Sequence, residues 1–242
     1  MEQHKYLVLD QGNTRCKAQV FMGDEVISSM NYACIDEAFE DFDSSLSRCI
    51  FSSTRNVSKE TQDQLKALFN QYVFLDGDTD LPIEVEYASK TTLGPDRIAN
   101  AVGAWNKFPN KHVLVIDIGT CMTFDFLHAT RGFLGGSISP GLKLRAKAMN
   151  DYTDKLPLVQ PNKDVNLIGN NTKQCLESGV VNGIRSEIWG TINAYRSYYP
   201  SALVVLTGGD HSYFDYGLKN FIFADSKLTT KGLYQILLHH VQ

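Results

Sequence analysis

The segment that most constrains the fold of this chain is Tyr6–Lys17, with the sequence YLVLDQGNTRCK. An apolar run ends at Asp10, the polar turn Gly12–Thr14 follows, and a second run begins at Cys16. This pattern predicts a strand, a tight turn and a returning strand. Because glycine has no Cβ, an anion can approach the main-chain N–H groups of such a turn. The segment is therefore a candidate anion-binding hairpin.

A second copy of this pattern, Val113–Phe126, has the sequence VLVIDIGTCMTFDF. Aligning Asp117 with Asp10 places Gly119 on Gly12. One turn motif of this kind is common, but two copies at the same place in two matched strand pairs favour a functional site. The repeat in a chain of 242 residues predicts two related halves that face each other across a cleft.

The order of the predicted elements indicates the fold class. Each half begins with three strands and continues with helices and strands, which is typical of mixed sheets covered by helices. We expect an N-terminal lobe of residues 1–110 and a C-terminal lobe of residues 111–242, divided at Pro109–Asn110. The G-x-G-x-x-G turn of a Rossmann fold and the P-loop pattern are both absent from the sequence, which excludes these two nucleotide-binding folds.

The composition excludes several classes of protein. A formal net charge of −4 gives no electrostatic reason to expect binding to nucleic acid or to an anionic membrane. No uncharged run is long enough to span a bilayer, and the first residues show no signal peptide. The five cysteines include no C-x-x-C pair, and the six histidines show no zinc-binding spacing. We therefore expect a cytoplasmic protein with reduced thiols and no nucleic-acid or membrane partner.

Two groups of residues carry candidate chemistry. In the first hairpin, Asp10 can hold a hydrated cation and Lys17 supplies positive charge, as in a metal-phosphate site. In the second group, Gly94–Arg97, the turn places Asp96 and Arg97 at the start of a predicted helix. An aspartate there often only caps the helix. Near a phosphate site, however, its carboxylate can accept a proton from an attacking hydroxyl, and the guanidinium can bind an anion bidentately.

A further strand, in the segment Leu203–Asp210, runs directly into Gly208–Gly209, a turn that suits the close approach of a nucleoside. The motifs D-x-G-N-T, D-x-G-T, G-G-x-I-x-P-G and T-G-G-D, in this order, resemble those of the acetate and sugar kinase/Hsp70/actin superfamily. More narrowly, G-x-D-R at Gly94–Arg97, the tyrosine Tyr87 before it, the N-T pair at Asn171–Thr172 and the overall length resemble type III pantothenate kinase. The resemblance implies an α/β protein with two RNase H-like (actin-like ATPase) lobes, each a mixed β-sheet flanked by helices, and a central cleft.

The resemblance also implies a role for each matching residue. Its ATP-phosphate loop falls on Asp10, Gln11, Gly12, Asn13, Thr14, Arg15, Cys16 and Lys17, with a further ATP contact at Thr120. Its substrate contacts fall on Tyr87, Gly94, Pro95, Asp96, Arg97 and Thr172. Asp96 would be the catalytic base, Asp117 would hold a monovalent cation, and Asp10 would hold Mg²⁺ through water.

The implied activity is ATP-dependent phosphorylation of pantothenate to 4'-phosphopantothenate, the first step of coenzyme A biosynthesis. The implied enzyme is a homodimer that uses Mg²⁺ and K⁺ or NH₄⁺. Arg97 would bind either the carboxylate of pantothenate or the transferring phosphate. Lys90 stands where many relatives have proline, and this difference bears on the shape of the substrate loop. Two other functions stay open: a sugar kinase or phosphatase on the same scaffold, and a non-catalytic nucleotide-binding regulator. The presence of Asp10, Asp96 and Arg97 argues against the regulator, because a pure sensor needs no base.

Overall fold

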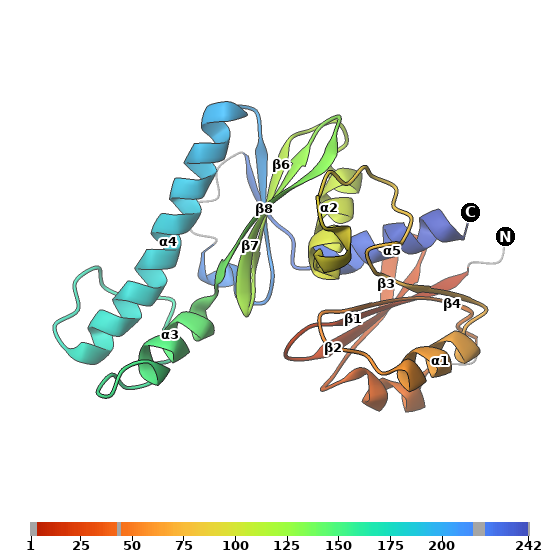
Figure 1. The fold of residues 1–242 in the computed structure, drawn as a ribbon, viewed down its shortest axis with the longest axis horizontal. Coiled ribbons are helices and arrows are strands. Elements are labelled where there is room, and N and C mark those ends of the chain that lie inside the picture. Colours follow the sequence, from red (N-terminus) through yellow and green to blue (C-terminus); the bar gives the residue numbers. More distant parts are fainter. Residues whose placement is uncertain (1–3, 43–44, 215–220, 242) are drawn as a thin grey trace. The chain divides into compact units, whose positions relative to one another are not determined.

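The computed structural model describes residues 4–42, 45–214 and 221–241 (Figure 1). The chain forms two compact units. The first consists of Met1–Pro109, Arg131–Phe133 and Lys227–Gln242, and the second of Asn110–Thr130 and Leu134–Ser226. The chain therefore passes into the second unit after Pro109, and its C-terminal segment returns to the first.

The first unit is built on a five-stranded sheet in the order β3-β2-β1-β4-β5. Its strands are β1 (Lys5–Gln11), β2 (Cys16–Met22), β3 (Glu25–Tyr32), β4 (Arg48–Ser53) and β5 (Gln71–Phe74). The central strand β1 pairs antiparallel with β2 and parallel with β4. The predicted strand, turn and returning strand are confirmed.

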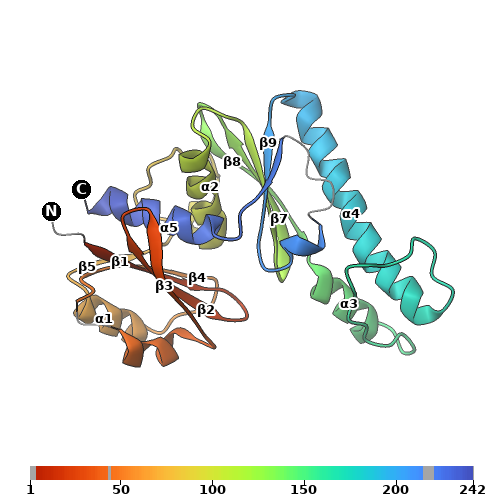
Figure 2. The same cartoon turned by 180° about the vertical axis from the view of Figure 1, so that it is seen from behind.

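Helices cover both faces of this sheet (Figure 2). On one face, Leu7, Leu9 and Phe51 pack with Leu65 of α1 (Lys59–Leu68). On the other lie α2 (Pro95–Lys107) and α5 (Leu228–His240). Two short 3₁₀ helices, η1 (Ile35–Asp41) and η2 (Lys90–Thr92), complete the unit.

The second unit repeats the topology of the first. Its sheet has the order β10-β9-β6-β7-β8, in which the central strand β6 again pairs antiparallel with the next strand and parallel with a later one. The strands are β6 (Val113–Ile118), β7 (Cys121–His128), β8 (Gly132–Pro140), β9 (Leu203–Thr207) and β10 (Ile222–Ala224). The helical elements are α3 (Leu142–Asp151), α4 (Thr172–Tyr198) and the 3₁₀ helix η3 (His211–Tyr213). The shared topology bears out the duplication predicted from the two hairpins.

The C-terminal helix α5 joins the first unit because small residues let it lie directly on α2. A Cβ on Gly232 would lie 1.7 Å from the carbonyl oxygen of Ala99. At the same contact, Thr229 Oγ1 donates a hydrogen bond of 2.8 Å to Asn100 Oδ1. The strand β10 and the helix α5 are close in sequence, but β10 pairs with β9 in the second unit, whereas α5 packs on α2 in the first. Among the residues that the structure describes, no helix has the length and apolar character needed to cross a membrane.

Candidate active site

The first predicted hairpin ends at a turn on the edge of the first sheet. Asp10 pairs with Lys17 on β2 and with Ser52 on β4, so the three side chains point to the same face of the sheet. The turn is closed by the Gly12 N–H, which donates 3.0 Å to the carbonyl oxygen of Arg15. Asn13, Thr14 and Arg15 are all exposed. The turn thus presents hydrogen-bond donors and a positive charge beside Asp10.

The surroundings of Asp10 suit a hydrated divalent cation. The Ser52 side chain is fully buried, and within residues 4–42, 45–214 and 221–241 its Oγ has no hydrogen-bond partner. A carboxylate and a hydroxyl oxygen on one sheet face are the kind of atoms that hold Mg²⁺ or its waters. Burial lowers the pKa of Lys17, and the negative charge of Asp10 opposes that shift.

Two residues of the predicted phosphate loop, Gln11 and Cys16, point into the protein. Gln11 is 4% exposed, and its side-chain amide is hydrogen-bonded to Ser53 Oγ and to the N–H of Ile35. Cys16 is fully buried, and burial raises the pKa of its thiol to about 12, so it stays protonated. Their side chains support the turn from within and do not face solvent.

The predicted substrate loop Gly94–Arg97 forms the start of α2. Gly94 is the N-cap, and Asp96 Oδ1 accepts a 2.9 Å hydrogen bond from the Arg97 N–H. A Cβ on Gly94 would lie 2.6 Å from that oxygen, so glycine leaves room for the carboxylate. Burial raises the pKa of Asp96, whereas the hydrogen bond and charge of Arg97 oppose the shift. The carboxylate is therefore a stronger base than an ordinary aspartate, as a proton acceptor requires.

Arg97 lies between two aromatic rings. It is 4% exposed, and its guanidinium carbon is 5.8 Å from the ring centre of Tyr87 and 5.7 Å from that of Phe133. Cation–π contacts of this kind fix the guanidinium in place. The structure thus brings the predicted residues Tyr87, Asp96 and Arg97 together.

Phe133 is a residue of this cluster that the sequence did not reveal. Its N–H donates 2.9 Å to the carbonyl oxygen of Glu84, and its own carbonyl oxygen accepts from the N–H of Glu86. The neighbouring Gly132 has φ +78°, and a Cβ there would lie 2.1 Å from the Glu84 oxygen. An apolar residue in a strand gives no sign of such a long-range pairing, and only the glycine before it marks the close approach.

In the second unit, three turns meet beside Asp117 and Thr120. Gly208 has φ +89°, and a Cβ there would lie 2.3 Å from Asp117 Oδ1. The Gly141 N–H, at the start of α3, donates 3.0 Å to the Thr120 carbonyl oxygen. The repeated hairpin, the glycine turn after β9 and the start of α3 therefore form one cluster.

Asp210, the last residue of the T-G-G-D motif, belongs to the same cluster, although the sequence assigned no role to it. Its N–H donates 2.9 Å to the carbonyl oxygen of Ile118, and burial raises the pKa of its carboxyl against the effect of Lys143. Its position directly after Gly208–Gly209 was the available signal. Thr172 lies elsewhere in this unit, as the exposed first residue of α4, where Asn171 Oδ1 caps the helix by accepting from the Gln174 N–H at 3.0 Å.

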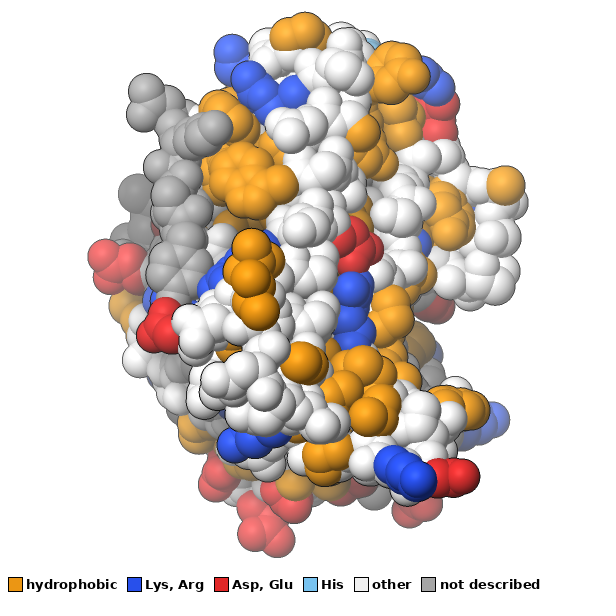
Figure 3. Space-filling view, turned by 90° about the vertical axis from the view of Figure 1, so that its left-hand side faces the viewer, with side chains coloured by type: hydrophobic (Ala, Val, Ile, Leu, Met, Phe, Trp, Pro, Cys, Tyr) orange, Lys and Arg blue, Asp and Glu red, His pale blue; other side chains and the backbone are white. Residues whose placement is uncertain are grey.

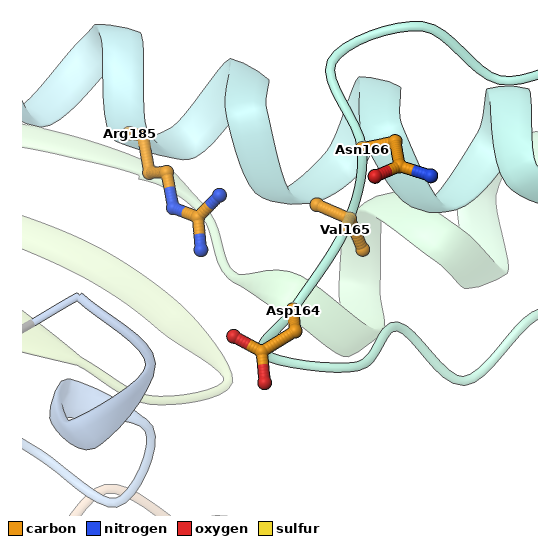
Figure 4. A pocket seen from close by; sticks show the side chains of 4 residues that line it. All are labelled: Asp164, Val165, Asn166 and Arg185. Atoms are coloured by element: carbon orange, nitrogen blue, oxygen red, sulfur yellow. The ribbon is translucent and has the colours of Figure 1, made fainter.

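A separate pocket of about 400 Å³ lies between α4 and the loop before it (Figure 4). It is lined by Asp164, Val165, Asn166 and Arg185. Arg185 donates 2.8 Å to Asn182 Oδ1 and 2.7 Å to the Lys163 carbonyl oxygen. The pocket contains none of the predicted site residues, and its arginine serves to hold the loop against α4.

Comparison with known proteins identifies the family to which this chain belongs. The family model "Type III pantothenate kinase" matches residues 6–194. A type III pantothenate kinase from Christiangramia forsetii is 38% identical over 237 residues, which cover 96% of this chain and 97% of the relative. The chain belongs to the type III pantothenate kinase family. It is a kinase, and the resemblance seen in G-x-D-R and the paired hairpins is confirmed.

Solved structures show that the fold of this kinase is widespread. A Baf family transcriptional activator, described as putative, from Campylobacter jejuni has a TM-score of 0.60 at 22% identity and covers 96% of this chain and 98% of its own. A glucokinase from an Antarctic psychrotroph has a TM-score of 0.56 at 11% identity and covers 98% and 100% of the two chains. At these identities the likeness concerns the fold alone. It confirms the predicted α/β class of actin-like ATPases and sugar kinases.

Proposed function

We propose that the chain transfers the terminal phosphate of ATP to the primary hydroxyl of pantothenate, with Asp96 as the catalytic base. Family membership supports the activity. One observation supports Asp96 as the base. Its carboxylate lies at the start of α2, next to Arg97, and burial raises its pKa. A carboxylate of this kind can orient a hydroxyl and accept its proton as phosphate is transferred.

The proposed roles of the remaining residues follow from their chemistry. The turn N–H groups, Asn13, Thr14 and Lys17 bind the phosphates of ATP, and Thr120 provides a further ATP contact. Tyr87 and Phe133 hold the Arg97 guanidinium, which binds an anion of the bound substrate. In-line phosphate transfer depends mainly on positioning and charge neutralisation, and this set of groups supplies both.

Two cation sites form part of the proposal. Asp10, with the buried Ser52 hydroxyl beside it, would hold Mg²⁺ through water. Bound Mg²⁺ neutralises charge on the ATP phosphates. Asp117 would bind K⁺ or NH₄⁺, and the close approach of Gly208 to its carboxylate shapes that site.

ADP release from ATP, measured with and without pantothenate, tests the proposed activity. We expect ADP release that depends on pantothenate, is absent with glucose as acceptor, and is faster in K⁺ than in Na⁺. Stimulation by glucose would favour the sugar-kinase alternative, and ATP binding without turnover would favour a regulator. Equal rates in K⁺ and Na⁺ would contradict the cation role of Asp117 while leaving the kinase activity in place.

We further propose that the enzyme is a homodimer formed by the second unit. Among the residues that the structure describes, most of the large apolar side chains that are exposed lie in this unit, and Leu167 and Ile168 are 81% and 82% exposed. Figure 3 shows several separate groups of apolar side chains exposed on the side of the molecule that carries α3 and α4. The adjacent side chains of Leu167 and Ile168 offer apolar surface that a second copy could cover.

Sedimentation of Ile168→Glu tests the dimer, because a buried charge without a partner is costly at an interface. The matched control is Leu68→Glu, which places the same charge at an exposed leucine of α1 in the first unit. We expect Ile168→Glu to sediment as a monomer and Leu68→Glu to behave as the parent protein. A dimeric Ile168→Glu would contradict the proposed interface.

A cytoplasmic location also belongs to the proposal, and the five free cysteines agree with a reducing compartment.

A further inference from the structure

The turn that follows β4 is bonded directly to the hairpin turn between β1 and β2. Arg55 in this turn donates one hydrogen bond to the main-chain oxygen of Asn13 and a second, of 3.5 Å, to that of Ala33. Its own main chain is fixed by Ser53, whose Oγ accepts from the Arg55 N–H at 3.1 Å and donates to the Arg55 carbonyl oxygen at 3.0 Å. The guanidinium therefore comes from a rigid turn and bridges two other segments.

Gln11 connects the same segments from inside. Its Nε2 donates 3.2 Å to Ser53 Oγ, and its Oε1 accepts 2.7 Å from the Ile35 N–H. Its main-chain oxygen accepts 2.9 Å from the Thr54 N–H. The hairpin turn, the turn after β4 and the start of η1 are thus tied together by Gln11 and Arg55. These bonds hold the shape of the hairpin turn before any ligand binds.

The bond to Asn13 has an electrostatic consequence. A main-chain carbonyl oxygen at a phosphate-binding turn repels the phosphate, and a guanidinium that binds this oxygen offsets the repulsion. The guanidinium also adds a full positive charge next to the turn. The charge reaches the start of β2: burial raises the pKa of Cys16, and the positive charge of Arg55 acts to lower it.

We infer that Arg55 is a positioning residue for ATP: by holding the Asn13 and Ala33 carbonyl oxygens, it fixes the phosphate-binding turn in its ligand-ready shape. The inference rests on the proposed role of the hairpin turn as the ATP-phosphate site. Arg55 lies outside the D-x-G-N-T motif, and no pattern in the sequence links it to the turn. It acts on nucleotide affinity and leaves the acceptor site at α2 unaffected.

The test compares Arg55→Met with Arg48→Met in the full-length enzyme. Arg48 is a matched control because it lies at the opposite end of β4, where it donates 2.6 Å to Gln71 Oε1 and lies 5.3 Å from the Tyr6 ring centre. The KM for ATP, the KM for pantothenate, kcat and the midpoint of thermal unfolding are measured for each variant. Loss of charge-assisted hydrogen bonds at Arg55 should raise the KM for ATP about tenfold. The KM for pantothenate should stay within about twofold of the parent, as should both KM values of Arg48→Met.

A second variant, Arg55→Lys, keeps the charge but replaces the planar fork that reaches two carbonyl oxygens. Its KM for ATP should lie between those of the parent and of Arg55→Met. The inference is overturned if Arg55→Met leaves the KM for ATP unchanged, or raises both KM values equally. It is also overturned if Arg48→Met has the same effect, or if Arg55→Lys restores the parent value completely.

Lys17→Met separates this inference from the assignment of the phosphate site. A raised KM for ATP in Lys17→Met together with an unchanged Arg55→Met would refute only the positioning role of Arg55. An unchanged KM for ATP in Lys17→Met would contradict the proposed phosphate turn, on which the inference depends.

Discussion

Gly232→Ala should destabilise the first unit although alanine is the better helix former. The new Cβ would lie 1.7 Å from the Ala99 carbonyl oxygen, where ordinary contacts begin at 3.4 Å. The helices α2 and α5 must therefore separate by about 1.7 Å. A shift of this size would also break the 2.8 Å hydrogen bond from Thr229 to Asn100.

The expected magnitude combines three terms. Overpacking at a rigid backbone contact costs about 2–3 kcal/mol, and loss of the Asn100 hydrogen bond costs about 1 kcal/mol more. The higher helix propensity of alanine offsets about 1 kcal/mol of this loss. The free energy of unfolding should thus fall by about 2–3 kcal/mol. Because Asp96 and Arg97 lie at the start of α2, kcat should fall as well.

Urea unfolding followed by tryptophan fluorescence measures this loss of stability in the first unit. The chain has two tryptophans, Trp105 in α2 and Trp189 in α4. A Trp189→Phe background leaves Trp105 as the reporter of α2 and α5. The control is Gly190→Ala in α4, where an added Cβ meets nothing within 4 Å; it is followed through Trp189 in a Trp105→Phe background, and stability should be kept or raised. A Gly232→Ala protein as stable as the parent would refute the argument.

Four further predictions concern the first unit. Ser58→Ala removes the Oγ that accepts 3.0 Å from the Thr61 N–H and should lower the free energy of urea unfolding by about 1 kcal/mol; no change would show that the cap is dispensable. Gly132→Ala, at φ +78°, should raise the KM for pantothenate by displacing Phe133 from Arg97, and an unchanged KM would argue against that contact. Because the pKa of Asp96 is raised, the acid limb of kcat/KM should lie above the ordinary aspartate value of 3.8, and a limb at or below 3.8 would contradict the role of Asp96 as base. For the same reason, the stability that its carboxyl contributes relative to Asp96→Asn should be greatest at low pH and decline as the pH rises through the raised pKa.

The sequence predicted the local elements of this fold well. The alternation of apolar and polar residues around Asp10 and Asp117 defined two hairpins, and their equivalence implied two sheets with the same topology. Both features depend on neighbouring residues, whose pattern is visible in the chain itself. The start of α2 at Gly94–Pro95 was visible for the same reason, because glycine and proline have fixed positions at helix ends.

The features that the sequence did not reveal depend on contacts between distant segments. From the sequence, Gly232 is only a slightly unfavourable residue within a predicted helix. The close approach of Ala99 on α2 explains why a glycine is needed there. The place of Phe133 beside Arg97 depends on a bridge to the segment around Val85. Arg55 reads as an ordinary loop arginine until its bond to Asn13 is seen. Such pairings are set by the packing of the whole unit, and single-sequence patterns carry no information about them.

The central claim is that the Asp96 carboxylate accepts the proton of the attacking hydroxyl. The most direct test is the rate of phosphate transfer by Asp96→Asn in a single turnover with saturating ATP and pantothenate, together with calorimetric binding of ATP. We expect the rate to fall by about a hundredfold to ten-thousandfold, because asparagine keeps the shape but accepts no proton, while ATP binding changes by less than about twofold. An Asp96→Asn enzyme that transfers phosphate at the parent rate would contradict the claim.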